Sequence, residues 1–432
     1  MRFVRRRGLE RTGTGSTPPP SKGRWLMPWS ALAYGDYRML WLSGVAQMLT
    51  MQMRTLVSAV WLYEATGSGL QLGLLGGVQL LVQLPAILYG GALADQIDRK
   101  KLMAYTQLVS VVLIGVMTVL AATDSLRPWH IYTVTAILSV SSTLGNPSRS
   151  ALTANVVPRS HLMHAVALNT ATFQIGAVAA PLAFSAAVYL LNNNYAYIFG
   201  ITTLIALPSV VMPLLIRTSG IPQNRQQEGS VIKRIIDGFR YVKGHPILPG
   251  LYAMDIGVTI VSHYRQILPL FADRLFKGGA VTVGYMNAAN SAGGILGTFS
   301  VLFLTNFRRK GMMVVIATLI YASLLIALGF TTALWLGLII LAGLGASDAV
   351  GMATRQTTVQ LTTSDNMRGR AVSFSSVSAM TANNLGTLEV GVMSDLIGAD
   401  NTLILGGGIG IAVVLIVWLT VRGIREYRYP DD

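Results

Sequence analysis

The stretch Gly91-Ala-Leu-Ala-Asp-Gln-Ile-Asp-Arg-Lys-Lys-Leu102 decides how this chain folds. It concentrates five charged residues in a chain of which only 12% is charged. Those residues are Asp95, Asp98, Arg99, Lys100 and Lys101. Long apolar runs lie on both sides, and so short a segment does not fold alone. We therefore expect a polar connection between two apolar helical segments.

The composition indicates a protein embedded in a membrane. Of the 432 residues, 52% are hydrophobic, and the mean hydropathy is +0.54. Soluble domains rarely have so apolar a composition, whereas polytopic membrane proteins require it. Many of the 16 prolines fall inside apolar runs, which membrane helices tolerate. Cysteine is absent, which excludes disulfides and thiolate metal sites.

Twelve apolar runs follow a basic tail, each near the ~20 residues that cross a bilayer. We expect residues 1–35 to be a disordered cytoplasmic tail, because no apolar core follows its arginines closely enough for a signal peptide. The predicted spans are 39–62, 70–93, 102–122, 130–151, 165–190, 195–216, 250–272, 281–304, 312–330, 333–353, 371–394 and 401–421. The predicted fold class is therefore an all-α polytopic membrane protein.

The positive charges test this map. If residue 1 is cytoplasmic, 28 of the 33 Lys and Arg residues fall in the tails and loops on that side. Only three fall in loops on the other side, and Arg54 and Arg265 fall within spans. This asymmetry predicts a plasma-membrane protein with both termini cytoplasmic. It also favours anionic lipid headgroups over nucleic acid as the partner of the net charge of +15.

Recurring offsets predict two six-helix lobes related by a parallel internal repeat. Arg54 and Arg265 are 211 residues apart, and Arg149 and Arg355 are 206 apart. Such offsets across one six-span unit are typical of two-lobed secondary transporters. The expected domains are lobes at 36–216 and 250–422, a linker at 217–249 and a tail at 423–432. The linker contains a predicted amphipathic helix, Val231–Lys243, suited to the headgroup boundary.

Several motifs resemble the major facilitator superfamily. The charged loop looks like its signature between helices 2 and 3, and a degraded antiporter run occurs in helix 5. Within the superfamily, the chain resembles the bacterial exporter branch that includes the enterobactin exporter and macrolide efflux pumps. The motifs are Gly91-Ala-Leu93-Ala94-Asp95-x-x-Asp98-Arg99-Lys100, Gly176-Ala-Val-Ala-Ala180-Pro181, Thr66-Gly67-Ser68, Gly238-Phe239-Arg240-Tyr241, Arg265-x-x-x-Pro269-x-x-Ala272-Asp273 and Arg368-Gly369-Arg370.

The resemblance implies a monomeric inner-membrane exporter, without cofactor, that moves an amphipathic siderophore- or drug-like molecule by alternating access. It implies exchange for protons, at a single site between the lobes. Many proton-driven antiporters of the superfamily carry an acid in helix 1 and an arginine midway along helix 4. Here helix 1 carries Arg54, and helix 4 has no charge at mid-membrane depth.

The resemblance also implies that the charged loop is a cytoplasmic gate. Asp95 would meet the N-terminal end of helix 11 around Arg370, by a charge–dipole contact. Gly91 would allow close helix approach, with Asp98 and Arg99 in the same gate. Alternatively, the basic residues of the loop are only topology anchors.

Two polar stripes nominate substrate-binding residues. Polar side chains recur on one face of span 1, and span 7 repeats the pattern. We expect both stripes to line a central cavity, because a charge that faces lipid is costly. Each arginine could instead pair with an acid and fix helix packing. The nominated residues are Gln47, Thr50, Arg54, Thr259, Arg265, Gln266 and, in span 11, Glu389.

Asp255, Asp348 and His263 are the candidates for proton coupling. A buried carboxylate changes its proton affinity when its hydration changes, which coupling requires. Asp255 is preferred because it lies on the span 7 stripe. Its alternative role is an ion pair with Arg54, and Asp348 could instead form a hydrogen bond between close-packed helices.

Other function classes remain open. A lipid or lysolipid flippase or an importer would share the fold, as would a non-transporting receptor or scaffold, although a scaffold gains nothing from Arg54 within the bilayer. His161 and His164 lack the further ligands of a metal site. Gly406–Gly410 lacks the strand of a dinucleotide loop and is expected to permit helix packing. No nucleophile–base set or phosphate loop indicates an enzyme.

Overall fold

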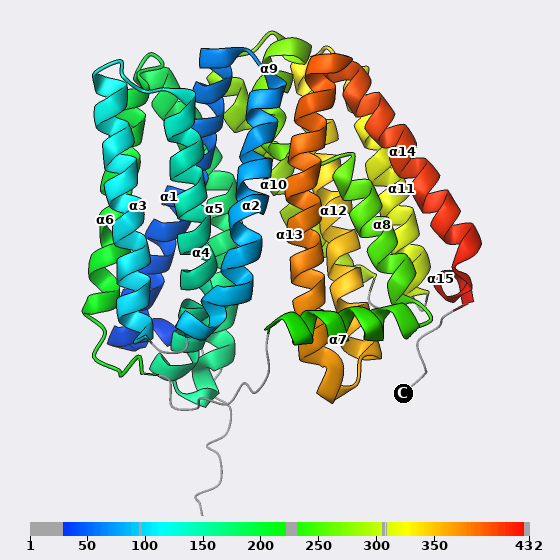
Figure 1. Ribbon diagram of the computed structural model, residues 1–432, viewed down its shortest axis with the longest axis horizontal. Helices are drawn as coiled ribbons and strands as arrows, with labels where there is room; N and C mark the ends of the chain where they lie inside the picture. Colours follow the sequence, from blue (N-terminus) through cyan, green and yellow to red (C-terminus); the bar gives the residue numbers. More distant parts are fainter. Residues whose placement is uncertain (1–28, 95–96, 222–230, 305–306, 308, 427–432) are drawn as a thin grey trace, which may run out of the picture.

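The structure is a computed structural model that describes residues 29–94, 97–221, 231–304, 307 and 309–426 (Figure 1). All regular secondary structure within these residues is helical. The first half of the chain forms α1 (Gly35–Thr66), α2 (Gly69–Ala94), α3 (Arg99–Ala122), α4 (Pro128–Val156), α5 (Leu162–Leu190) and α6 (Tyr195–Leu214). Short 3-10 turns, η1 (Ser30–Ala33) and η2 (Arg159–His161), precede α1 and α5.

The second half follows a linker helix, α7 (Val231–Gly244). It forms α8 (Leu248–Ile260), η3 (Arg265–Ile267), α9 (Leu268–Phe276), α10 (Ala280–Phe303), α11 (Lys310–Gly329), α12 (Leu334–Thr362), α13 (Asp365–Leu396), α14 (Ala399–Thr420) and α15 (Arg422–Glu426). Figure 1 shows α7 along one end of the molecule, below the second half, and α9 at the opposite end. We refer to these as the α7 end and the α9 end.

Every predicted span coincides with helix, with one correction. Span 7 was predicted as continuous over 250–272, but it is broken into α8 and α9. Seven helices of the described chain are long and apolar enough to cross a membrane: α2, α3, α5, α6, α11, α12 and α14. The long helices α1, α4, α10 and α13 are more polar. That all twelve segments cross the bilayer stays a prediction.

Helical structure extends into both segments that were predicted as tails. Ala31 in η1 is fully buried, so order begins before residue 36, although residues 1–28 lie outside the described part. At the other end, α15 buries Ile424 against Gly250 and Gly311. The apolar alanine and isoleucine side chains account for this order, since each gains from leaving water.

The helices pack in two groups with matching internal contacts. In the first half α3 packs on α6, α2 on α4 and α1 on α5; in the second, α11 packs on α14, α10 on α12 and α8 on α13. The groups meet where α2 packs on α13 and α5 on α10. A shift of six spans converts each contact into its counterpart, which is the pattern that a parallel repeat produces.

The two halves are joined toward the α9 end. Asp395 of α13 accepts hydrogen bonds from the Ser68 hydroxyl and from the backbone N–H groups of Gly69 and Leu70, at 2.6–2.8 Å. The Tyr63 hydroxyl donates to Asp273 at 2.7 Å. Below them, Gly76 of α2 lies directly against the backbone of α13. Among the described residues, the hydrogen bond between the halves that lies farthest from the α9 end joins Asn384 to Gln83.

The predicted cytoplasmic gate lies partly outside the described residues. Asp95 lies outside the described residues, and Gly91 lies within the last turn of α2. Arg370 pairs with Asp237 of α7 at 3.2 Å. Asp98 caps α3, where it accepts the Lys100 N–H, and the N–H of Arg99 donates to the Gly220 carbonyl. These local contacts anchor the loop to its own half.

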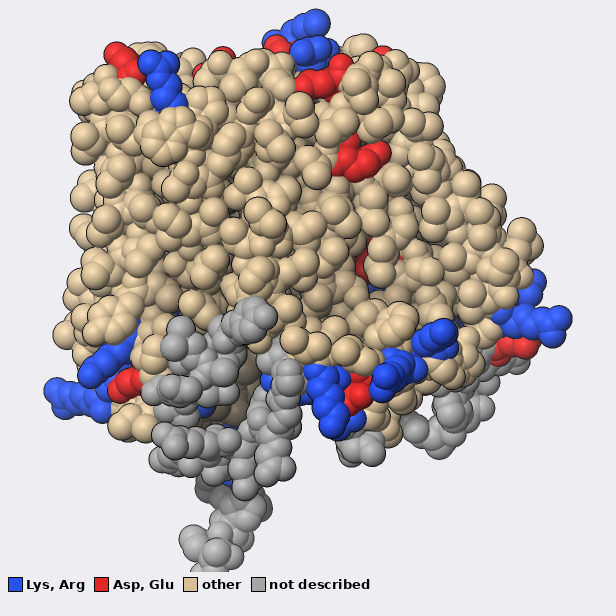
Figure 2. All heavy atoms as spheres, in the orientation of Figure 1, with Lys and Arg blue, Asp and Glu red and all other residues tan. Residues whose placement is uncertain are grey.

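The amphipathic linker helix is confirmed. In α7, Ile232, Ile236 and Phe239 are exposed, while Gly238 lies against the backbone of Arg370. Figure 2 shows Lys and Arg side chains gathered along the α7 end, with a smaller group at the α9 end. An exposed apolar row beside basic residues is typical of a helix at the headgroup boundary.

We predict that Gly76→Val separates the halves at the α9 end. A Cβ atom at Gly76 would overlap the Asn384 carbonyl and the Thr387 side chain, and overpacking of this kind costs about 1–3 kcal/mol. Since the chain has no cysteine, Ser125→Cys and Thr332→Cys can carry spin labels on the exposed loops of the two halves. Double electron–electron resonance should show a longer distance in the variant.

The matched control is Gly408→Val, because a Cβ at Gly408 meets nothing within 4 Å. It should leave the distance distribution unchanged. An unaltered distribution in Gly76→Val would show that this contact does not hold the halves together.

Candidate functional site

The break between α8 and α9 shapes the main site. Pro269 stands in the first turn of α9, a position that suits proline because the backbone N–H groups of a first turn have no partner within the helix. The freed backbone and nearby side chains find partners in neighbouring helices: the Tyr321 hydroxyl donates to the Ser262 carbonyl at 3.2 Å, and Asn290 donates to the Tyr264 hydroxyl at 2.7 Å. Broken helices that line cavities are common at transporter binding sites.

Glycines on two neighbouring helices make room for the break. A Cβ at Gly386 would overlap the Thr259 carbonyl, and one at Gly406 would overlap the Val261 carbonyl. The expectation that Gly406–Gly410 permits helix packing is confirmed, because Gly407 also lies directly against α11. Close backbone contact therefore holds the broken segment in place.

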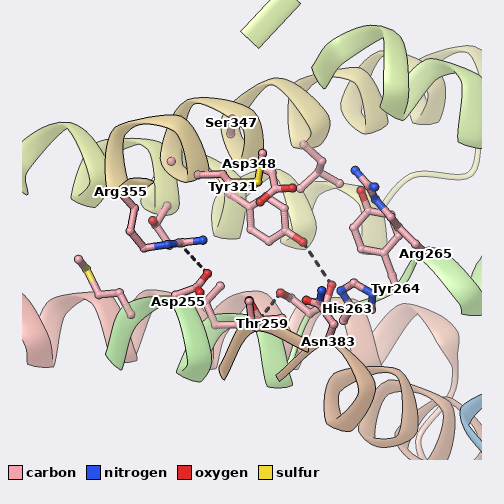
Figure 3. A pocket seen from close by; sticks show the side chains of 18 of the residues that line it. Asp255, Thr259, His263, Tyr264, Arg265, Tyr321, Ser347, Asp348, Arg355 and Asn383 are labelled. Carbon is pink, nitrogen blue, oxygen red and sulfur yellow. Dashed lines mark hydrogen bonds and ion pairs between the residues drawn. The ribbon is translucent and has the colours of Figure 1, made fainter. Parts of the chain in front are cut away.

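The break faces a cavity of about 260 Å³ within the second half, which we call the second-half cavity (Figure 3). Five predicted site residues line it: Asp255, Thr259, His263, Arg265 and Asp348. They come from α8, the segment after it, and α12, so the fold unites residues that lie far apart in sequence. Sequence reasoning missed other lining residues, including Asn290, Tyr321, Ser347, Arg355 and Asn383.

The preferred carboxylate, Asp255, is held in an ion pair. Its Oδ1 lies 2.6 Å from Nη1 of Arg355, and the two side chains are only 14% and 15% exposed. The sequence offered an ion pair between Asp255 and Arg54 as the alternative role. An ion pair does form, but the partner of Asp255 is Arg355 and not Arg54. A buried pair offsets the desolvation of both charges, and loss of either member leaves the other uncompensated.

Asp348 is placed differently. Its side chain is exposed to the second-half cavity, and within the described chain no hydrogen bond or ion pair engages its carboxylate. The expected hydrogen bond between close-packed helices is therefore absent there. The close packing itself exists one turn earlier, where Gly345 lies against the Asn290 carbonyl. The cavity thus contains one paired and one unpaired carboxylate.

Arg54 and Arg265 also lack partners in the part of the chain that the structure describes. Arg54 is half-buried on α1 and makes no hydrogen bond or ion pair there. Arg265 is exposed and lines both the second-half cavity and a neighbouring cavity of about 230 Å³ between the halves. Gln266 lines the latter cavity and donates to Gln79 at 3.3 Å, which joins the halves.

The remaining nominated residues lie apart from this cavity. Gln47 lines a separate cavity of about 630 Å³ within the first half. Thr50 is buried on α1, so the predicted stripe is divided between packing and cavity. Glu389 lines none of the described cavities, and its Oε2 atom is buried without a hydrogen bond. The internal offset between Arg149 and Arg355 was the one sequence signal that could have identified Arg355 as a site residue.

We predict that Arg355→Leu destabilises the protein by about 3–5 kcal/mol, because it leaves the Asp255 carboxylate buried and unpaired. Thermal unfolding of the purified protein should show a lower midpoint. The double variant Asp255→Leu/Arg355→Leu removes both charges and should recover most of the loss. Equal stability of the single variant and the unchanged protein would contradict the structural importance of the pair.

Comparison with known proteins places this geometry in context. The profile of a family described as "Transmembrane secretion effector" matches residues 26–427. An enterobactin exporter of Shigella boydii serotype 4 (strain Sb227) is 27% identical over 402 residues, with 90% of each chain covered. One from Escherichia coli O1:K1 / APEC is 26% identical over the same length and coverage.

Solved structures share the fold at low sequence identity. A point mutant of the nucleoside transporter NupG superposes with a TM-score of 0.72 at 13% identity, covering 89% of this chain and 99% of its own. A bacterial homologue of the lysosomal transporter Spinster, inward-facing and unoccupied, superposes with a TM-score of 0.69 at 14% identity, covering 92% and 99%. A POT family transporter in complex with 5-aminolevulinic acid gives 0.73 at 11% identity, covering 91% and 97%.

Proposed function

Because the chain belongs to the transmembrane secretion effector family of the major facilitator superfamily, we propose that it exports an amphipathic small molecule in exchange for protons. The protein is a transporter rather than an enzyme. The relatives named as enterobactin exporters support a siderophore-like substrate. The observation that carries proton exchange is the second-half cavity, where the unpaired Asp348 lies beside the Asp255–Arg355 pair.

The positions of the contacts between the halves support alternating access. Hydrogen bonds and glycine contacts between them lie from the α9 end to mid-helix, at Ser68, Gly76 and Gln83. The conformation is therefore proposed to be closed at the α9 end and accessible from the α7 end. The basic loops gather at the α7 end, which we assign to the cytoplasm.

The proposed exchange uses the cost of a charge in a closing cavity. A carboxylate that loses its water binds a proton more readily, since burial disfavours the charged form. In the conformation open to the outside, Asp348 would take up a proton, and the cavity could then close over a neutral carboxyl group and reopen to the cytoplasm. Release of that proton would restore the charge before the next outward movement. Asp255 and His263 line the same cavity and are proposed to take part in the exchange.

The substrate is proposed to lie between the halves, against Arg54, Arg265 and Gln266. Arg265 and Gln266 line the cavity between the halves. Both arginines lack partners among the described residues, and a charge at this depth is retained when it meets water or a ligand. In the opposite conformation, the loop containing Gly91 and Asp95 is proposed to close the cytoplasmic face near Arg370. Asp237 holds Arg370 in the present conformation.

We predict that Asp348→Asn removes the dependence of transport on a pH gradient, because an amide does not bind the exchanged proton. The assay is the flux of enterobactin, the compound in the names of the relatives, in proteoliposomes with and without an imposed gradient. The unchanged protein should transport at least about tenfold faster with the gradient. The control Asp400→Asn alters an exposed carboxylate at the start of α14 and should retain that stimulation. If the pH gradient stimulated flux in Asp348→Asn as much as in the unchanged protein, Asp348 would not be the proton-coupling residue.

We predict that Arg54→Gln lowers that flux at least about tenfold while the melting temperature stays within about 2 °C of the unchanged protein. The reason is that Arg54 has no partner to lose among the described residues, so its removal affects ligand contact rather than packing. The control Arg217→Gln changes an exposed arginine between α6 and α7 and should transport normally. A large loss of stability with normal flux would instead identify Arg54 as a packing residue.

A further inference from the structure

The first half contains a second cavity, which we call the first-half cavity. Its volume is about 630 Å³, within the range that encloses a drug-sized ligand. Helices α1, α4 and α5 line it, and Trp41 and Phe173 provide aromatic surface. Asn146, Asn169 and Thr170 add polar groups at its wall. No residue lining it is acidic, and its one ionised side chain is Arg149.

Arg149 reaches from α4 across to α1. Its Nη1 atom donates to the Leu40 carbonyl at 3.3 Å, and Nη2 donates to the Ser43 hydroxyl at 3.2 Å. Its Nε atom is buried without a hydrogen bond. These are long bonds to neutral acceptors, and the described chain supplies no carboxylate to this guanidinium. The positive charge is therefore solvated by weak partners and left uncompensated.

Comparison with the second half indicates that Arg149 lacks a carboxylate partner among the described residues. Arg149 corresponds to Arg355 at an offset of 206, and Gly44 corresponds to Asp255 at the offset of 211 that relates the two span arginines. In the second half the arginine meets its carboxylate at 2.6 Å. In the first half a Cβ at Gly44 would overlap the Arg149 guanidinium. Glycine thus stands where the other half places an acid, and the Arg149 guanidinium lies in the space that a side chain at this position would fill.

We propose that the first-half cavity binds an amphipathic organic anion, whose acidic group pairs with Arg149 as Asp255 pairs with Arg355. A carboxylate-type group would complete charge-assisted hydrogen bonds with the guanidinium. Trp41, fixed by a 2.9 Å hydrogen bond from its indole N–H to Thr172, would contact the apolar body of the ligand together with Phe173. The ligand is therefore an acid with an aromatic or otherwise apolar body.

The inference deepens the proposed function. It rests on that function in one respect only, namely that the bound anion is regarded as a transported substrate. The binding itself is tested in detergent without any gradient or flux. A failure of transport and a failure of anion binding are therefore separate results.

The test uses two probes of equal shape, 2-naphthoate and its neutral analogue 2-naphthamide. Isothermal titration calorimetry on the full-length protein should give a Kd at least about tenfold lower for the carboxylate, the ratio expected for a hydrogen-bonded charge. Arg149→Gln should reduce that ratio to within about twofold. The control Arg159→Gln removes an exposed arginine of η2, outside the cavity, and should keep the full ratio.

If Arg149→Gln folds poorly, a second pair of variants tests the proposal. Gly44→Asp supplies the internal acid and should abolish the preference for the carboxylate, whereas Gly44→Asn has nearly the same size without the charge and should retain it. Equal affinity of the unchanged protein for both probes would overturn the proposal. So would a full preference in Arg149→Gln, or the same loss in both Gly44 variants.

Discussion

The structure depends on one constraint: a charge at membrane depth must be paired or must face water or a ligand. Asp255 and Arg355 meet this constraint as a pair that is almost fully buried. Asp348 meets it by facing the second-half cavity, and Arg149 by facing the first-half cavity. Arg54 and Glu389 line none of the described cavities, but the four side chains named above mark internal surfaces of the helix bundle. Those surfaces are where the proposed transport takes place.

The same constraint explains the asymmetry between two otherwise matching halves. Their helix contacts correspond pair by pair, yet one arginine is neutralised by its own half and, among the described residues, the other is not. This difference suits a division of labour in which the second half exchanges protons and the first half binds the acidic group of the substrate. The halves are coupled because both must close and open together around their contact at Gly76 and Asp395.

Sequence reasoning predicted most of the fold, because hydropathy and span length are dictated by the bilayer. It could not locate the break at His263 and Tyr264, since the signal of Pro269 is shared with many continuous membrane helices. It gathered Asp255, Thr259, His263, Arg265 and Asp348 as candidates, and the fold places them in one cavity. It did not identify the partner of Asp255, which required knowing that α8 and α12 face each other. It also assigned Arg149 and Arg355 to the loops, because each lies near the end of an apolar run.

The central claim is that these charges line a water-filled cavity open to one side of the membrane at a time. Ser347→Cys places a single thiol in the second-half cavity of a chain that has no other cysteine. A membrane-impermeant maleimide can be added to either side of oriented vesicles that contain this variant. In the conformation closed at the α9 end, we predict labelling from the α7 side and at least about tenfold slower labelling from the other side. Absence of labelling from both sides, or equal labelling from both, would contradict the account.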